Sequence, residues 1–555
     1  MKLSFALYRG FVLVLPWIVL GGLSARSQGA VPDFLWLQTA GGSSVEVPRR
    51  VVVDNESSSY VAGSFASTNL SFGSGIVVSN SVRTVGAPND AFIAKYNSNG
   101  VPVWARAFGG GSEDVASDVA VDAQRNVYVT GSFSSTSFLI GGVTLTNYAP
   151  GGNGSLFVAK FNPGGNLLWV RASEQSTFSM SGSAIVVDAS GNSYVTGNFI
   201  GTNSISGTNL VSQGSTDIML LKYDANGNLT WARQSGGTGL EGIPAAALDK
   251  AGNLYLLANI RSTNVAFGGF VFSIQGTDDD QDLIVAKYNP AGTVLWARQY
   301  GSTNIEDGSS IAVDGSNNVF ITGNFSGGSV TFGGTTLVKS NAFPFSALFT
   351  AKLDTLGNAL WAKTAQGDFV DFSQSIAVDF AGNSYIVGGF QSSTLRFDAA
   401  VTLTNSTQAV FNTEADAFVA KYDPAGNLLW AARNSGVLDE RAFSVAVDST
   451  ANAYITGWTQ GTNVMFGNLA TTNVTSDIFL TKLDTDFAWL QISRLNPSSV
   501  VLSWPATKSA FSPQFSTNLL TWTNLTGITG TNNGQIQFTN TTAGAKGFFR
   551  LKKAN

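Results

Sequence analysis

The stretch DAFVAKYDPAGNLLWAARNSG, from Asp416 to Gly436, decides the fold because near-copies of it occur throughout the chain. Six copies place a lysine nine residues before a tryptophan: Lys95/Trp104, Lys160/Trp169, Lys222/Trp231, Lys287/Trp296, Lys352/Trp361 and Lys421/Trp430. A seventh lysine, Lys482, has no tryptophan at that distance. We interpret the stretch as a repeated building block rather than as a functional site used many times.

The other half of the repeating unit is seen in SSIAVDGSNNVFITGNF, Ser309 to Phe325, and it also recurs along the chain. Its aspartate recurs in every copy, at Asp54, Asp122, Asp188, Asp249, Asp314, Asp379 and Asp448. These positions define seven units of about 65 residues, and a period of that length is typical of repeat architectures.

Each unit contains four strand-like runs, which we name a to d: IAVD, VFITGNF, FVAKY and LLWAR. The runs are short, rich in branched and aromatic residues, and separated by turns with Gly or Asn where a positive φ is needed. A four-stranded antiparallel meander repeated seven times predicts an all-β fold, a seven-bladed β-propeller. We expect the repeated Lys of strand c to bind a carboxylate or carbonyl, and the Asp ending strand a to cap the a–b turn.

The two ends of the repeat region complete each other. After Lys482 the chain continues as LDTDFAWLQIS, with Trp489 too close and no turn of the usual kind. At the other end, PDFLWLQTAGG (Pro32 to Gly42) is a strand d without a unit of its own, and it carries Trp36. We therefore expect the N-terminal strand to complete the last blade, which closes the ring and removes an open sheet edge.

This pattern resembles the SBBP-type β-propeller repeat of secreted bacterial proteins. The resemblance rests on SIAVDxxGNxYITGxF, FGGxxL and DAFVAKYDPAGNLLWARQ, and it covers roughly residues 31–486. It implies a propeller and a bacterial, extracellular setting, and it implies no single activity.

Differences in composition divide the chain into three segments. Residues 1–30 have the order of a secretory signal peptide: Lys2 and Arg9, an apolar run from Phe11 to Leu23, then small residues. Residues 31–486 form the propeller, and residues 487–555 are expected to form a small C-terminal β-domain that resembles part of a fibronectin type III sandwich. We expect a secreted protein, extracellular or at the cell surface, with attachment or export as one role for the tail.

Composition also excludes several functions. The chain has no Cys, which excludes disulfides and thiolate chemistry, and no His, which excludes the commonest general base. Loss of the signal peptide takes the net charge from −5 to −8, and an acidic surface disfavours nucleic acid as a partner. No later stretch is long and apolar enough for a membrane span. We expect a monomer without a cofactor.

We predict a non-enzymatic binding or scaffold protein whose ligand, a glycan or a cell-surface protein, sits on the rim formed by the b–c and d–a loops. These loops are long and differ between units, whereas the a–b and c–d turns are short and uniform. The alternative is a carbohydrate-active enzyme, a hydrolase or lyase, that works with carboxylates alone.

Acidic residues of the d–a connections are the candidate ligand-binding residues. They are Glu113, Asp114, Glu241, Glu306, Asp307, Asp371, Asp439 and Glu440. Gathered around one mouth, they would focus a negative potential and attract a cationic group, a divalent ion or a sugar-rich ligand. A weaker Ca²⁺ candidate is the acidic run Asp278, Asp279, Asp280 and Asp282. The plainer interpretations are acids that cap turns and a solvated acidic loop.

Overall fold

A computed structural model of the chain describes two compact units, Asp33–Thr485 and a second unit made of Met1–Pro32 with Asp486–Asn555. The described residues are 12–13, 32–82, 88–242, 245–277, 280–339, 345–407, 414–436, 438–461, 463–471, 477–484, 491–496, 499–505, 511–516, 523–525, 529–532, 535–541 and 548–553. Apart from Val12–Leu13, the predicted signal peptide lies outside them, as does Trp489.

The described part of the larger unit contains seven four-stranded antiparallel sheets, which we number as blades in chain order. Blade 1 has β3 (Glu46–Val53), β4 (Ser59–Phe65), β7 (Asp90–Tyr96) and β8 (Pro102–Phe108). Blade 2 has β9 (Asp114–Val121), β10 (Val127–Phe133), β13 (Ser155–Phe161) and β14 (Leu167–Ala172). Blade 3 has β16 (Ser179–Val187), β17 (Ser193–Ile200), β20 (Asp217–Tyr223) and β21 (Leu229–Ser235).

The remaining blades repeat this order of strands a to d. Blade 4 has β22 (Ala245–Leu248), β23 (Leu254–Ile260), β26 (Asp282–Tyr288) and β27 (Val294–Tyr300). Blade 5 has β28 (Glu306–Val313), β29 (Val319–Phe325), β32 (Ala347–Leu353) and β33 (Ala359–Ala365). Blade 6 has β34 (Asp371–Val378), β35 (Ser384–Phe390), β38 (Asp416–Tyr422) and β39 (Leu428–Arg433). Blade 7 has β40 (Glu440–Val447), β41 (Ala453–Thr459), β44 (Asp477–Asp484) and β2 (Asp33–Ala40).

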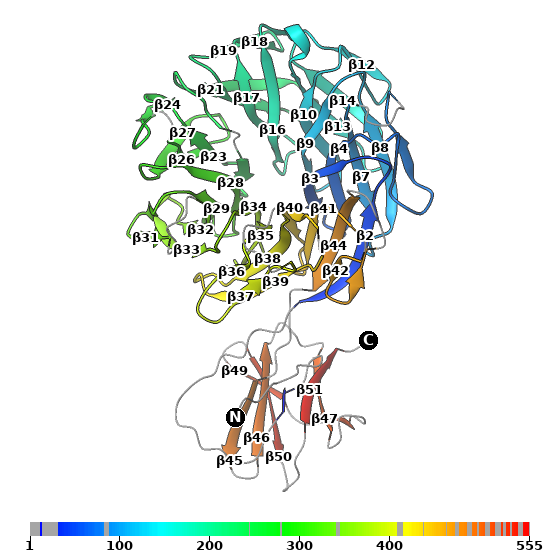
Figure 1. The fold of residues 1–555 in the computed structure, drawn as a ribbon, viewed down its shortest axis with the longest axis vertical. Helices are drawn as coiled ribbons and strands as arrows, with labels where there is room; N and C mark the ends of the chain where they lie inside the picture. Colours follow the sequence, from blue (N-terminus) through cyan, green and yellow to red (C-terminus); the bar gives the residue numbers. More distant parts are fainter. Residues whose placement is uncertain are drawn as a thin grey trace. The chain divides into compact units, whose positions relative to one another are not determined.

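The blades form a closed ring (Figure 1). Each strand a contacts strand a of the next blade, and β40 of blade 7 contacts β3 of blade 1. The fold class predicted from the sequence, an all-β propeller, is confirmed. The closing strand is also the expected one, because β2 pairs with β44 and places Trp36 opposite Lys482.

Each b–c connection contains a small hairpin that the sequence analysis treated as loop. The pairs are β5 (Asn69–Ser71)/β6 (Val77–Ser79), β11 (Ser137–Ile140)/β12 (Val143–Thr146), β18 (Thr202–Ile205)/β19 (Thr208–Val211), β24 (Val265–Phe267)/β25 (Phe270–Phe272), β30 (Ser329–Phe332)/β31 (Thr335–Val338), β36 (Thr394–Arg396)/β37 (Thr402–Thr404) and β42 (Met465–Phe466)/β43 (Leu469–Ala470). β15 (Gln175–Ser176) joins β18, and a short 3-10 turn, η1 (Pro150–Gly152), follows β12. In several blades the hairpin bridges to the strand d of the preceding blade, as in Gly109 with Leu139.

The smaller unit is also built from strands. One sheet has the order β45 (Gln491–Asn496), β46 (Ser499–Pro505), β50 (Gln535–Thr541) and β49 (Thr529–Asn532). The other has β1 (Val12–Leu13), β51 (Phe548–Lys553), β47 (Phe511–Ser516) and β48 (Thr523–Asn524). Leu502 and Phe538 are buried among neighbouring apolar side chains.

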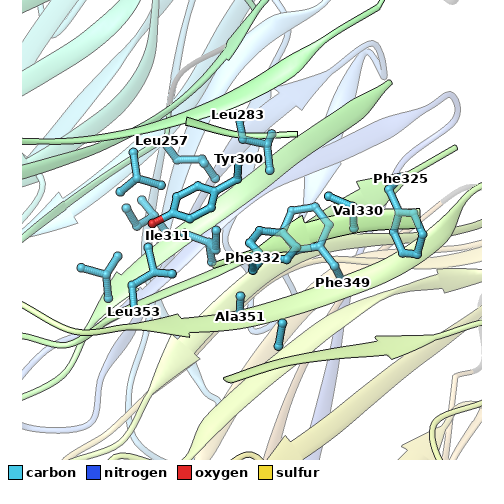
Figure 2. Packing of buried hydrophobic residues seen from close by; sticks show 14 of the residues in the cluster. Leu257, Leu283, Tyr300, Ile311, Phe325, Val330, Phe332, Phe349, Ala351 and Leu353 are labelled. Carbon is cyan, nitrogen blue, oxygen red and sulfur yellow. The ribbon is translucent and has the colours of Figure 1, made fainter. Parts of the chain in front are cut away.

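The propeller core lies between blades rather than inside any one of them. Figure 2 shows Leu257, Leu283 and Tyr300 of blade 4 meeting Ile311 and Phe349 of blade 5 in one buried cluster. A four-stranded sheet has no interior of its own, so burial of its apolar faces requires a neighbour on each side.

At six of the seven junctions the repeated tryptophan connects one blade to the next. Its indole Nε1 donates to a carbonyl of the next c–d turn, as Trp36 does to Ser98 O at 3.2 Å and Trp104 to Pro163 O at 3.0 Å. Gly100 in that turn has φ near 80°, and a Cβ there would lie 2.7 Å from the Trp36 ring. The turn therefore needs glycine for its backbone conformation and for the close approach of the indole.

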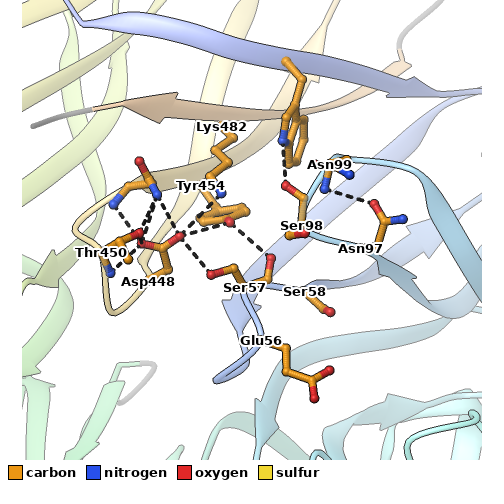
Figure 3. A network of polar contacts seen from close by, with 12 residues as sticks. Glu56, Ser57, Ser58, Asn97, Ser98, Asn99, Asp448, Thr450, Tyr454 and Lys482 are labelled. Atoms are coloured by element: carbon orange, nitrogen blue, oxygen red, sulfur yellow. Dashed lines mark hydrogen bonds and ion pairs between the residues drawn. The ribbon is translucent and has the colours of Figure 1, made fainter. Parts of the chain in front are cut away.

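The lysines and aspartates of the repeat have the partners that the sequence predicts. Lys482 Nζ lies 3.5 Å from Asp448 Oδ2, which also accepts a hydrogen bond from the Tyr454 hydroxyl (Figure 3). Ser57 of blade 1 donates to the same carboxylate of blade 7, so this cluster spans the point of ring closure. In blade 3 the lysine, Lys222, donates to a turn carbonyl instead.

Replacement of Trp36 tests the closure. We expect Trp36→Ala to lower the free energy of unfolding by about 2–4 kcal/mol, because it removes an indole from the last junction. The matched control is Leu35→Ala on the same strand, where the side chain is 49% exposed and the loss should stay within about 0.5 kcal/mol. Urea unfolding followed by tryptophan fluorescence and circular dichroism measures both variants. Equal losses would contradict the assignment of β2 as a structural strand of blade 7.

Candidate functional site

Most of the predicted rim acids occupy one repeated position, the first residue of strand a. Asp114, Glu306, Asp371 and Glu440 begin β9, β28, β34 and β40, and Glu241 pairs with Ile260 just before β22. All five are at most 2% exposed. Glu46 holds the same position in blade 1, where the sequence analysis missed it.

Each of these carboxylates is covered by the chain arriving from the preceding blade. Gly110 N donates to Asp114 Oδ2 at 2.8 Å, and Ser135 Oγ donates to the same oxygen at 2.6 Å. In blade 5 the serine has moved: Gly327 replaces the strand b serine, and Ser302 in the turn donates to Glu306 instead. The carboxylate is thus a structural acceptor for the d–a turn.

Glu440 of blade 7 lacks this support. Glycines occupy both of the positions that supply serine elsewhere, Gly436 in the turn and Gly461 after strand b. Neither carboxyl oxygen completes a hydrogen bond among the described residues. Burial, with Asp416 adding repulsion, raises the pKa of Glu440 to about 9, although the nearby Asn434 amide lowers it somewhat.

A second row of acids begins strand c of five blades: Asp90, Asp217, Asp282, Asp416 and Asp477. Each raises the pKa of the strand a acid of the next blade, so Asp90 acts on Asp114 and Asp477 on Glu46. Burial is the larger cause in both cases, and these two pKa values reach about 7. Asp416 has a cation beside it, with Arg433 Nη1 at 2.9 Å. Two buried carboxyls therefore meet at five blade junctions.

This arrangement corrects the expectation of a ring of solvent-facing acids. Only Glu113 and Asp307 of the eight candidates are exposed. Glu113 accepts from Asn89 Nδ2 at 2.7 Å, and Asp307 accepts from Asn259 Nδ2 at 2.7 Å. Asp439 is 8% exposed and pairs with Arg441 Nε at 2.9 Å. The first position of strand a faces the neighbouring blade, which buries the other five.

The innermost strands carry a feature that the sequence analysis missed, a β-bulge at one shared register. The bulged residues are Arg49, Ser117, Ser183, Ser309, Gln374 and Phe443. We call this set the bulge ring. A bulge adds one residue to a strand and re-aims its side chain. The signal available in the sequence was a polar residue ahead of the IAVD run in five of the six units, with Phe443 in the sixth.

Members of the bulge ring are open to solvent. Arg49 is exposed and the other five are half-buried. Strand a has strand b along one edge and neighbouring blades against its faces, so solvent reaches it from the ring axis. Burial nevertheless lowers the pKa of Arg49 and raises that of Asp307, two exposed residues.

The Ca²⁺ candidates remain a prediction. Asp278 and Asp279 lie outside the described residues. Asp280 Oδ2 accepts from Thr277 N at 2.6 Å, and Asp282 Oδ2 accepts from Gln275 N at 2.8 Å. Among the residues that the structure describes, no three acidic side chains gather in a way that could hold a metal ion. The same residues include no helix long and apolar enough to cross a membrane.

Comparison with known proteins agrees with a β-propeller repeat protein. The family model of the SBBP type, described as a beta-propeller repeat, matches residues 295–324, and the resemblance seen in the sequence is confirmed there. The chain is 26% identical over 470 residues to the "Uncharacterized WD repeat-containing protein L264" of Acanthamoeba polyphaga mimivirus, a match that covers 77% of this chain. It spans only 30% of that relative.

Two similar solved structures share little sequence with the chain. Sqt1 from Chaetomium thermophilum is 10% identical with a TM-score of 0.36, and the match covers 95% of this chain and 100% of that one. A puromycin hydrolase is 10% identical with a TM-score of 0.39, covering 83% of this chain and 58% of the other.

The buried carboxyls at the start of strand a make stability depend on pH. Burial raises the pKa of Glu46, Asp114, Glu306 and Asp371 to about 7, and the chain has no His to titrate in this range. Above the unfolded-state pKa of about 4, the folded protein holds more protons than the unfolded one, so the free energy of unfolding falls as pH rises toward 7. We expect lower urea midpoints at about pH 8 than at about pH 5.

Glu440→Gln isolates one of these groups. The amide is neutral at every pH, so the variant should stay close to the wild type near pH 5 and exceed it by several kcal/mol near pH 8. The control is Glu56→Gln, a carboxylate with 60% of its side chain exposed, which should change stability by at most about 0.5 kcal/mol. A pH-independent difference between Glu440→Gln and the wild type would refute the assignment.

Proposed function

We propose that this protein is a non-enzymatic binding or scaffold protein that takes its ligand on the rim formed by the b–c hairpins and the d–a turns. The observation that carries this proposal is the bulge ring, which presents different side chains at equivalent positions of a rigid ring. A scaffold of repeated blades fixes such positions well, and variation on it is where binding usually resides.

The hairpins support the same rim. Each ends in side chains that differ between blades, and several are large, apolar and exposed: Leu139, Val211, Val271 and Val338 are 53–61% exposed. The opposite rim consists of short turns of one type, each closed by an aspartate or asparagine that accepts from its own backbone. A uniform turn serves stability, whereas a variable hairpin offers specificity.

A glycan is the ligand class that this rim fits best. Ser117, Ser183, Ser309 and Gln374 offer hydroxyl and amide groups, and these make no hydrogen bond within the described part of the chain. The rival function, a carboxylate-dependent carbohydrate-active enzyme, needs accessible acids. Five of the eight predicted acids are buried at junctions, so they cannot reach a glycosidic bond.

The setting in which the protein works belongs to the same proposal. Residues 1–30 direct secretion, the propeller acts as a monomer outside the cell or at its surface, and the C-terminal β-domain attaches or shields it. A cell-surface protein would use the same rim as a glycan.

Substitutions on the two rims test the location of the ligand. We expect Leu139→Asp and Val338→Asp to weaken binding of any polysaccharide retained from a soluble panel, because each places a charge on a hairpin. The control is Phe380→Asp on a short turn, where the side chain is 90% exposed and binding should be unchanged. Affinity electrophoresis measures all three variants. A ligand that responds only to Phe380→Asp would place the site on the opposite rim.

A further inference from the structure

The junction between blades 6 and 7 lacks the tryptophan contact of the other six. At those six junctions the indole donates a hydrogen bond to the next c–d turn. Trp430 of blade 6 makes no hydrogen bond within the described part of the chain. Blade 7 takes its strand d, β2, from the other end of the propeller, so no c–d turn joins β44 to it. The way in which the ring closes therefore removes the acceptor that Trp430 would use.

A second donor to the next c–d turn is missing at the same place. Two residues after the tryptophan, Arg106 and Arg233 each donate Nε to a glycine carbonyl of that turn, at 2.9 and 3.3 Å. Blade 6 has Ala432 at this position. Ala432 and Asn434 of blade 6 line a cavity of about 20 Å³ together with Ala442 of blade 7. The junction thus lacks both donors and is incompletely filled.

Polar groups are also buried without partners at this junction. Neither carboxyl oxygen of Glu440 nor the Nδ2 donor of Asn434 completes a hydrogen bond with the described residues. In other blades a serine donates to the equivalent carboxylate, whereas blade 7 has Gly436 and Gly461 at the two positions that supply it. A buried polar group without a partner destabilises the closed junction, and opening would let water reach it.

The charges around Glu440 act in the same direction. The charged groups that act most strongly on it are acids, and they raise its pKa by repelling its negative charge: Asp416, Asp439 and Glu414. The two arginines nearby, Arg433 and Arg441, already pair with Asp416 and Asp439. An ionised Glu440 is therefore repelled inside the closed junction, and water admitted by opening would relieve that repulsion.

We propose that the ring opens locally between blades 6 and 7, and that ionisation of Glu440 favours the open state. Blade 7 stays attached to blade 1 when this happens, because Trp36 donates to Ser98 O and Val51 N donates to Ser444 Oγ across that junction. A local opening of this kind costs less free energy than unfolding of the whole propeller. The inference is independent of the ligand, and the proton is the regulator.

Thiol labelling measures the opening, because the chain has no Cys and a single introduced cysteine reports alone. Ala442→Cys places the thiol between blades 6 and 7, and the control Ala116→Cys places it at the equivalent residue of blade 2. Both alanines are at most 1% exposed. We expect Ala442→Cys to react with Ellman's reagent roughly tenfold or more faster near pH 8, after each rate is divided by that of the same variant in urea. Equal rates would show that only global unfolding exposes the thiols and would overturn the inference.

Gly436→Ser supplies the missing donor. Ser302, at the same position of blade 5, donates its N–H and its hydroxyl to Glu306 at 2.8 and 2.6 Å. The atoms nearest to a Cβ at Gly436 belong to the end of the flexible Glu440 side chain, which can move aside. In the Ala442→Cys background we expect Gly436→Ser to slow labelling severalfold. The control is Gly111→Ser, where a Cβ meets nothing within 4 Å and the labelling rate should not change. An equal effect of the two serines would contradict the proposal.

The pH dependence tests the role of Glu440. Its pKa is about 9 in the closed state, so the preference for closure is complete below the ordinary value of about 4 and falls until about pH 9. Four equivalent acids have pKa values of only about 7. Between about pH 7 and pH 8.5 the normalised labelling of Ala442→Cys should therefore rise by up to about tenfold per pH unit. Glu440→Gln should remove this rise, and a rise that survives the substitution would overturn the proposed control by Glu440.

Discussion

The structure depends on one constraint, that a sheet of four short strands can bury its two faces only against other sheets. Every blade therefore needs a neighbour on each side, and a row of blades has no stable end until it closes. An indole that donates a hydrogen bond to the next blade's turn, as Trp36 does to Ser98 O, helps to hold two neighbouring blades against each other. The acid clusters and the bulges occupy places that the stacking of blades creates.

Most of the fold could be predicted from the sequence because the same pattern of strands and turns recurs in seven units. The repeat identified strands a to d, a carboxylate or carbonyl partner for the Lys, turn capping by the Asp, and the missing strand d of blade 7. The b–c hairpins were not predicted because their sequences differ between blades, so no shared pattern revealed the strands within them. The bulge ring was not predicted for another reason. One extra residue in a strand cannot be told from ordinary alternation until the residues paired with it on the neighbouring strand are known.

The candidate site was predicted less well than the fold. The acids were assigned to a mouth from their position before strand a, but the direction of a side chain depends on whether it is the first or the second residue of that strand. Glu306 faces the preceding blade and is buried, whereas Asp307, one residue later, is exposed. A shift of one residue exchanges the two faces of a strand.

Ring closure by β2 also affects how the chain can fold while it is being synthesised. The Thr481 hydroxyl donates to Trp36 O across 445 residues of chain. At 5–20 residues per second, roughly 20–90 s separate the emergence of the two strands from a ribosome. During that time β2 has no partner and blade 1 has an uncovered face, a combination that favours misassembly and pairing with other chains. A protein closed in this way benefits from being kept unfolded, or shielded, until its last blade is made.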